Sequence, residues 1–187
     1  MAPSDTTTQQ DAVQVLIADH LETEQLFSQI ESLPEGEQRD SAVRDVTREL
    51  SIHAAIEEQI LYPAMRRSLV DGDSKVEESI EEHQQVKDTL AAIERTDDPA
   101  ERQQLLTTLI ADVRHHVEEE EGELFPELRA ATSQDELREM GAKLESAKKM
   151  APTHPHPNAP NTPPGNIVGG AAAAVMDKVR DAVSGDS

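Results

Sequence analysis

The chain has 187 residues, of which 17 are basic and 38 acidic, so its formal net charge is -21. This charge repels the phosphates of nucleic acids and anionic lipid head groups, and we expect neither as a partner. Acidic residues occur in every segment, which fits either ordinary solubility or adaptation to high salt. Cysteine is absent, which excludes disulfides, thiolate chemistry and cysteine-ligated iron–sulfur clusters.

The N-terminal residues 1–11 are polar and lack the basic start and apolar centre of a signal peptide. No apolar run approaches the roughly 20 residues that a membrane-spanning helix needs, so we expect a cytoplasmic protein that does not enter a membrane. Aromatic residues are few, namely Phe27, Tyr62 and Phe125. The core must therefore be aliphatic, which favours packed helices over aromatic-rich strands.

Apolar residues recur with helical spacing in four long stretches, which predicts four long helices. The first covers residues 11–31, and the second covers residues 37–69, with Pro63 expected to kink or stop it near its end. A capping box that begins at Ser74 should open the third helix. Asp98, which precedes a proline, is the expected N-cap of the fourth helix.

The residues after the fourth helix differ in composition. A capping box at Ser133 is expected to open a short fifth helix. Residues 152–164 contain six prolines and should form an extended linker, in which His154 and His156 are expected to be ordinary linker residues. The stretch 169–183 has the spacing of an amphipathic helix that would be only marginally stable alone, so we expect it to dock on the bundle or on a partner.

These elements predict an all-α protein. Short connections between long helices favour an antiparallel up-down-up-down four-helix bundle, to which a short fifth helix and a Pro-rich C-terminal tail are added. We divide the chain into a helical bundle at 10–150, a Pro-rich linker at 151–168 and a C-terminal amphipathic helix at 169–187.

One motif containing histidine and glutamate occurs twice, with an offset of 63 residues. Its two copies are His53-Ala-Ala-Ile-Glu57-Glu58-Gln-Ile-Leu61-Tyr62-Pro63 and His116-Val-Glu-Glu-Glu120-Glu121-Gly-Glu-Leu124-Phe125-Pro126. The pairs Asp19-His20 and Glu82-His83 recur at the same offset. The repeat predicts two copies of a helical hairpin related by a pseudo-twofold axis, so that equivalent histidines face each other across the core.

The motif has the chemistry of a metal site. Residues four apart lie on one face of a helix, so each histidine of the motif and the glutamate four residues after it can bind one centre. Imidazole nitrogen suits iron, zinc, copper or nickel, and a carboxylate can bridge two ions, which leaves positions open to water, O2, peroxide or NO. Buried carboxylates without partners would be strongly destabilising, so the alternative to metal is a neutralised polar network. The predicted metal ligands are His20, His53, Glu57, His83, His116 and Glu120.

Other polar residues near the motif are expected to support the site or to pack. Glu58 and Glu121 each follow a predicted ligand and are rotated by about 100° from it on a helix, so they should support the ligands from outside or face solvent. Asp19 and Glu82 could orient the histidines that directly follow them. We expect Tyr62 to pack the end of the bundle rather than to reach the metal pocket.

The spaced set of motifs resembles that of hemerythrin-like HHE cation-binding domain proteins over about residues 11–130. The resemblance implies a four-helix bundle around a non-haem di-iron centre. It also implies the ligand set: His20 and His53 on one iron, His83 and His116 on the other, with Glu57 and Glu120 as bridges. Marine oxygen carriers of this kind have a further histidine where this chain has Ser79, and their last carboxylate is an aspartate rather than Glu120. The missing histidine leaves an additional position for an exogenous ligand and argues against reversible O2 transport.

The resemblance therefore implies a di-iron protein that binds or reacts with O2, H2O2 or NO, with catalase-like turnover as one form of this function. We assign no catalytic residue, because Glu58, Glu121 and Tyr62 are the only nearby acid–base groups. Two functions without turnover are the alternatives. One is an iron or oxygen sensor in which the C-terminal helix reports occupancy, and the other is a metal buffer.

Overall fold

The computed structural model of the chain describes residues 10–162 and 165–184. Outside the described residues lie the N-terminal segment 1–9, the linker prolines Pro163 and Pro164, and residues 185–187 of the predicted C-terminal helix. In the described ranges every regular element is a helix, which confirms the all-α class. None of these helices combines the length and the apolar character that crossing a bilayer requires.

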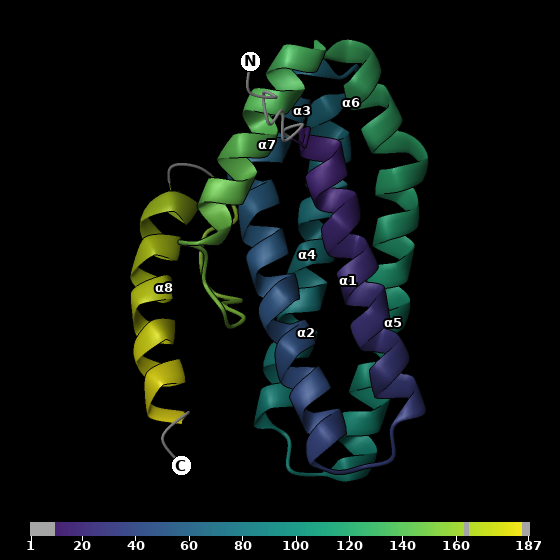
Figure 1. Cartoon of the computed structure of the whole chain (residues 1–187), viewed down its shortest axis with the longest axis vertical. Coiled ribbons are helices and arrows are strands. Elements are labelled where there is room, and N and C mark those ends of the chain that lie inside the picture. The colour runs from purple at the N-terminus through teal and green to yellow at the C-terminus, as the bar shows by residue number, and fades with distance from the viewer. Residues whose placement is uncertain (1–9, 163–164, 185–187) are drawn as a thin grey trace, which may run out of the picture.

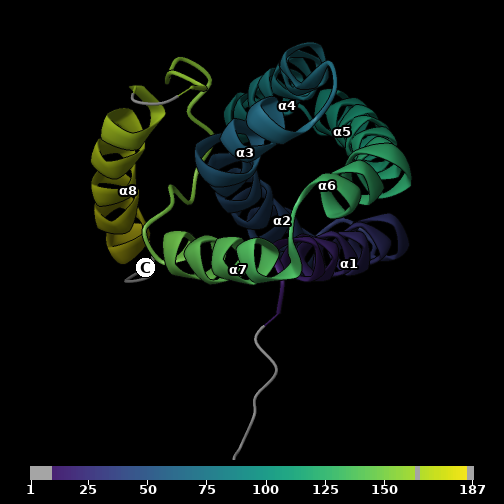
Figure 2. The same ribbon diagram turned by 90° about the horizontal axis from the view of Figure 1, so that it is seen from above.

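Four long helical rods lie side by side and form the bundle (Figure 1). The first and third rods are single helices, whereas the second and fourth each contain a π-helical turn. In chain order the rods are α1 (Ala12–Ser32); α2 (Glu37–Ile56), η1 (Glu57–Leu61) and α3 (Tyr62–Ser68); α4 (Gly72–Arg95); and α5 (Pro99–Glu119), η2 (Glu120–Leu124) and α6 (Phe125–Ala131). Figure 2 shows the rods arranged around a common centre, and this arrangement confirms the predicted four-helix bundle.

The second rod ends at Ser68, within one residue of the expected end. Pro63 does not stop this rod, because α3 continues the helix past it. In η1 the N–H of Tyr62 donates to the carbonyl of Glu57, five residues earlier. Pro63 is the second residue of α3, in the first turn after η1, where its missing N–H is tolerated. The second copy of the motif repeats this turn and its proline in η2 and α6.

The start of the third rod also differs from the prediction. The capping box expected at Ser74 is wrong, because α4 already begins at Gly72. A Cβ atom at position 72 would lie 2.6 Å from the carbonyl oxygen of Met65, so only glycine allows α4 to begin this close to the end of α3. The capping box predicted at Ser133 is confirmed, since Ser133 and the glutamate three residues later exchange hydrogen bonds.

The residues after the bundle form a second layer on one side of it (Figure 2). α7 (Gln134–Lys148) packs along α1 and α2, and α8 (Gly165–Ser184) lies beyond the Pro-rich segment. This segment is fixed to α4, because Gln84 donates to the carbonyl of Pro157 at 3.1 Å and Asn161 donates to Gln84 at 3.0 Å.

Two histidines of the Pro-rich segment hold α8 in place. The ring nitrogens of His154 lie 2.7 Å from Glu94 on α4 and 2.9 Å from Asp181 on α8. His156 lies 3.0 Å from the carboxylate of Asp177, also on α8. The expectation that these histidines are ordinary linker residues is therefore wrong.

The core consists of two apolar clusters stacked along the bundle. One lies near η1 and η2 and contains Leu16, Ile56, Leu61 and Phe125, among others. The other lies toward the opposite end and is built from residues such as Phe27, Val46, Leu90 and Leu109. On every rod the histidine of the repeat lies between the residues of these two clusters, so the bundle contains a polar layer enclosed by apolar side chains.

Candidate metal centre

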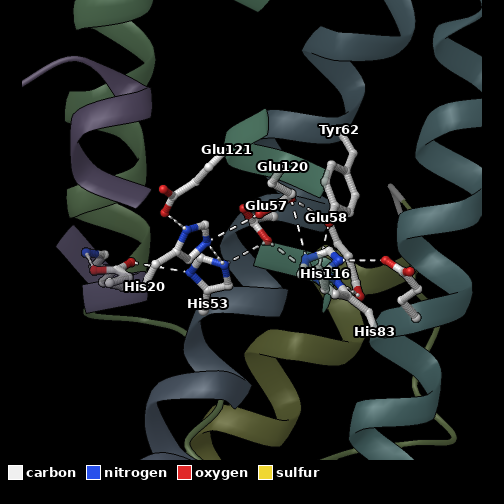
Figure 3. A network of polar contacts seen from close by, with 12 residues as sticks. His20, His53, Glu57, Glu58, Tyr62, His83, His116, Glu120 and Glu121 are labelled. Atoms are coloured by element: carbon white, nitrogen blue, oxygen red, sulfur yellow. Dashed lines mark hydrogen bonds and ion pairs between the residues drawn. The ribbon is translucent and has the colours of Figure 1, made fainter. Parts of the chain in front are cut away.

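The six predicted ligands converge in this polar layer (Figure 3). Each of the four rods contributes a histidine, and the two π-helical turns contribute the glutamates at their first positions. All six side chains are buried, and Glu57 and Glu120 are 0% exposed. The glutamates lie at the centre, with one pair of histidines on either side.

The distances define two adjoining groups of donor atoms. One group contains His20, His53, Glu57 and Glu120, and the other contains Glu57, His83 and His116; within each, the donor atoms lie within 4.8 Å of one another. Glu120 also approaches the second group, at 3.5 Å from His116 Nε2. Both carboxylates therefore lie within reach of both histidine pairs, as the repeat predicts.

The donor atoms fit a cation better than they fit one another. The Nε2 atoms of His20 and His53 are 3.3 Å apart, and those of His83 and His116 are 3.2 Å apart. Within the described residues, both carboxylate oxygens of Glu57 and one of Glu120 have no hydrogen-bond donor although they are buried. Burial of such oxygens is strongly unfavourable, and a bound cation would remove the penalty. Imidazole nitrogen together with carboxylate oxygen is a donor set that iron and zinc accept.

Each histidine also has a carboxylate on its outer nitrogen, Nδ1. Glu121 lies 2.8 Å from His20 and Glu82 lies 2.7 Å from His116. On the remaining two rods, the Glu58–His83 distance is 3.2 Å and the Asp19–His53 distance, the longest of the four, is 3.5 Å. A carboxylate at Nδ1 holds the ring proton there and turns the unprotonated Nε2 toward a metal.

This arrangement corrects part of the interpretation of the sequence. Glu58 and Glu121 support the histidines from outside, which was one of the two expected roles. Asp19 and Glu82 do not orient the histidines that follow them. Because adjacent residues on a helix point in different directions, they reach the histidine of the next rod in the same hairpin.

The pseudo-twofold symmetry is broken by two lysines. Lys148 of α7 lies 2.6 Å from Asp19, and Lys87 of α4 lies 2.6 Å from Glu58. In the described part of the chain, neither Glu82 nor Glu121 pairs with a lysine or arginine. Each histidine pair therefore has one outer carboxylate neutralised by lysine and one that is not.

Tyr62 breaks the symmetry at the centre itself. Its hydroxyl lies 3.1 Å from His83 Nε2 and donates to Glu120 at 3.3 Å, so the expectation that it only packs the bundle end is wrong. Its equivalent, Phe125, stacks on His20 with a ring separation of 5.7 Å and has no hydroxyl. The i to i+5 hydrogen bond of η1 places residue 62 over Glu57, which an α-helical projection of the sequence does not do.

Burial and the neighbouring carboxylates determine the ionisation of the side chains in the site. Burial lowers the pKa of His83, but the carboxylate of Glu57, which lies 3.4 Å from Nε2, and that of Glu58 outweigh burial and raise the pKa to about 9. Burial opposes protonation of His53 as well, yet the charge of Glu57 raises its pKa well above 6.5. Burial and the charges of Glu57 and Glu120 raise the pKa of Tyr62 well above 10, so its phenol stays neutral. In the metal-free protein, protons on His53 and His83 therefore offset the charge of Glu57, and a metal must displace them.

Known proteins are similar to this chain in sequence and in fold. The sequence model of the hemerythrin HHE cation binding domain matches residues 11–128. The chain is 33% identical over 161 residues to a hemerythrin-like protein of Schizosaccharomyces pombe, a match that covers 83% of this chain and 79% of that protein. A crystal structure of a hemerythrin HHE cation binding domain-containing protein from Mycobacterium kansasii is similar with a TM-score of 0.66 and 26% identity, over 75% of this chain and 86% of that one.

A third relative is much longer than the region it shares. A protein of Nostoc sp. named DNA nickase is 26% identical over 135 residues, which are 72% of this chain but 38% of that protein. This chain thus spans about two fifths of its length.

The fold and the histidine–glutamate layer define a metal-binding helical bundle of the hemerythrin-like class. The chain belongs to the hemerythrin HHE cation-binding domain family.

Proposed function

We propose that this protein holds two iron ions and binds or reacts with O2, peroxide or NO at them. His20 and His53 would hold one ion, His83 and His116 the other, with Glu57 and Glu120 between them. The main support is the position of two buried carboxylates, with oxygens that lack hydrogen-bond donors, between two pairs of histidines.

The donor count leaves room for a ligand. Each ion would receive two imidazole nitrogens and two carboxylate oxygens, fewer donors than iron accepts. At the position where marine oxygen carriers have a further histidine, Ser79 donates its hydroxyl to the carbonyl of Lys75 at 3.2 Å. An exogenous ligand would therefore meet no fifth imidazole there. A bound iron pair supplies electron transfer to such a ligand.

The chain's own residues would orient and protect the site. The outer carboxylates hold the Nδ1 protons of the histidines, which keeps each Nε2 directed inward. The Tyr62 hydroxyl lies beside His83 and Glu120, where it could donate a hydrogen bond to a ligand bound at the centre. The two apolar clusters on either side of the polar layer exclude bulk water.

A metal sensor or buffer without turnover is the second candidate function. It is favoured by a chain of contacts from the site to the tail, because Lys87 binds both Glu58 and Asn161 of the Pro-rich segment, the latter at 3.0 Å. A metal bound at His83 would therefore change the contacts that connect Glu58 and Lys87 to the Pro-rich segment. A net charge of -21 repels DNA phosphates, which disfavours the DNA nicking for which the Nostoc relative is named.

Metal analysis of protein prepared in air, together with its visible absorption, tests the proposal. We expect two iron ions per chain in the unmodified protein and a loss of iron in Glu120→Gln. The matched control is Glu118→Gln, which changes an exposed residue of the same rod and should keep both ions.

Three outcomes separate the candidate functions. Rapid consumption of H2O2 that is abolished by Glu120→Gln selects a redox enzyme. Iron binding without consumption selects the sensor. Zinc alone, without visible absorption, selects a metal buffer and contradicts the iron proposal.

A further inference from the structure

The net charge of the chain is confined to the bundle. Residues 1–132 contain 11 basic and 31 acidic residues, whereas residues 133–187 contain 6 basic and 7 acidic residues. The layer formed by α7, the Pro-rich segment and α8 is therefore nearly neutral and covers one side of a strongly acidic body (Figure 2). Two copies of the chain would repel each other through any surface except this one.

Among the side chains of α8 that the structure describes, those that face the bundle are small or polar. Gly170, Ala174 and Asp177 face inward and are buried. A Cβ atom at position 170 would lie 3.3 Å from the side-chain nitrogen of Gln59, which shows how closely α8 approaches η1. The buried carboxylate of Asp177 accepts from the backbone N–H groups of Thr153 and His154 at 2.9 and 3.2 Å. These polar contacts fix the rotation of α8 about its own axis.

This rotation turns the apolar stripe of α8 outward. Val175, Met176 and Val179 are 64%, 72% and 62% exposed, and they are three of the six large apolar residues that are exposed in the described part of the chain. Their spacing of three and four residues is that of the seam between two paired helices. A helix that only needed to cover the bundle would bury these residues and expose Asp177.

We propose that α8 is a self-association surface, through which two copies of this chain pair their Val175–Val179 stripes. The expected partner is a second copy of the chain, because the nearly neutral layers of two copies can meet without the repulsion that separates their acidic bundles. Because α8 lies beyond the Pro-rich segment (Figures 1 and 2), pairing through it keeps the two acidic bundles apart. The stripe is short, so the interface is smaller than the roughly 1,200 Å² of a standard complex, and the dimer is weak and concentration-dependent.

Cross-linking gives the sharpest test, because the chain contains no cysteine. A single Met176→Cys substitution places one thiol in the proposed seam, and Val70→Cys places one on the bundle at a site that is 83% exposed. Under mild oxidation of the full chain, we expect Met176→Cys to form a covalent dimer at least about tenfold faster than Val70→Cys. Equal rates would overturn the proposal.

Analytical ultracentrifugation of the full chain provides an independent measurement. The unmodified protein should show a monomer–dimer equilibrium that strengthens when ionic strength rises from about 0.15 M to about 1 M, because the Debye length falls from about 8 Å to about 3 Å and bundle repulsion is screened. Val175→Glu/Val179→Glu should weaken dimerisation at least about tenfold, and Leu21→Glu/Val70→Glu, which changes exposed apolar residues of the bundle, should not.

The remaining outcomes count against a second copy. A chain that stays monomeric up to about 1 mM at both ionic strengths overturns the proposal. So does binding of the unmodified protein to vesicles of anionic lipid, if Val175→Glu/Val179→Glu abolishes it while dimerisation is absent. Metal content and circular dichroism should be the same in both double variants, so a failure here is separate from a failure of the metal site.

Discussion

At the scale of single residues, the histidines that the repeat makes equivalent, His20 with His83 and His53 with His116, have different surroundings. His53 and His83 face outer carboxylates that are paired with lysine, whereas the carboxylates beside His20 and His116 have no such partner in the described part of the chain. A carboxylate paired with lysine accepts the Nδ1 proton less strongly, so the two imidazoles of each histidine pair should differ as metal donors. The asymmetry lies outside the ligands, where the repeat does not extend.

The pKa of His83 predicts how the stability of the metal-free protein depends on pH. Below pH 6.5 the imidazole is protonated in both the folded and the unfolded chain, and its ion pairs with Glu57 and Glu58 stabilise the fold fully. Between pH 6.5 and about 9 only the folded chain holds this proton, so the free energy of unfolding falls as pH rises. The part of this loss that comes from His83 is on the order of 3 kcal/mol.

Urea unfolding of the metal-free protein at a series of pH values measures this effect. In His83→Gln the decline should be shallower, because one of the titrating groups is gone. The metal-loaded protein should not show the decline, since the metal has already displaced the proton. A free energy of unfolding that is constant over this range in the metal-free protein would contradict the assignment.

Replacing Tyr62 by phenylalanine would make the two halves of the centre more alike. Tyr62→Phe removes the hydroxyl that lies 3.1 Å from His83 and 3.3 Å from Glu120, and the metal-free protein should lose about 0.5–1.5 kcal/mol of stability. Iron content should stay the same while the visible absorption changes. An identical spectrum would show that the hydroxyl does not border the bound ions.

At the scale of elements, the two π-helical turns and one glycine position the site. Each turn begins at a central glutamate and is followed by a proline, so the extra residue of the turn lies directly beside the ligands. α7 covers this region from outside and supplies Lys148 to Asp19. Its close approach depends on Gly141, where an added Cβ would collide with the backbone of Gln10 and lie 2.9 Å from the carbonyl carbon of Asp11.

Gly141→Ala should therefore destabilise the protein by about 1–3 kcal/mol, although alanine favours a helix. The matched control is Gly122→Ala, where no atom lies within 4 Å of the added Cβ and stability should be unchanged or should rise by up to about 1 kcal/mol. Thermal unfolding of both variants gives the comparison. An equal loss of stability in both variants would show that the packing of α7 does not depend on the close contact of Gly141 with the start of α1.

At the scale of the whole molecule, the metal would join all four rods at one level. Ligands that come together only in the folded chain transfer binding free energy to folding. Removal of metal with a chelator should therefore lower the Tm of the unmodified protein and barely change that of His53→Ala/His116→Ala. Calorimetry with and without chelator measures both shifts, and equal responses would count against a metal centre at these residues.

The sequence by itself determined the bundle, and its repeat indicated the six candidate ligands. Both follow from local properties of the chain, namely helical periodicity and i to i+4 spacing. The outer partners of His53 and His116, the approach of Tyr62 to the pocket and the outward apolar stripe of α8 were decided only by tertiary structure. Each depends on which rods are neighbours and on how each helix is rotated about its axis. Those rotations are fixed by contacts between distant segments, such as Gly141 against the start of α1 and Asp177 against the Pro-rich segment, which no local pattern encodes.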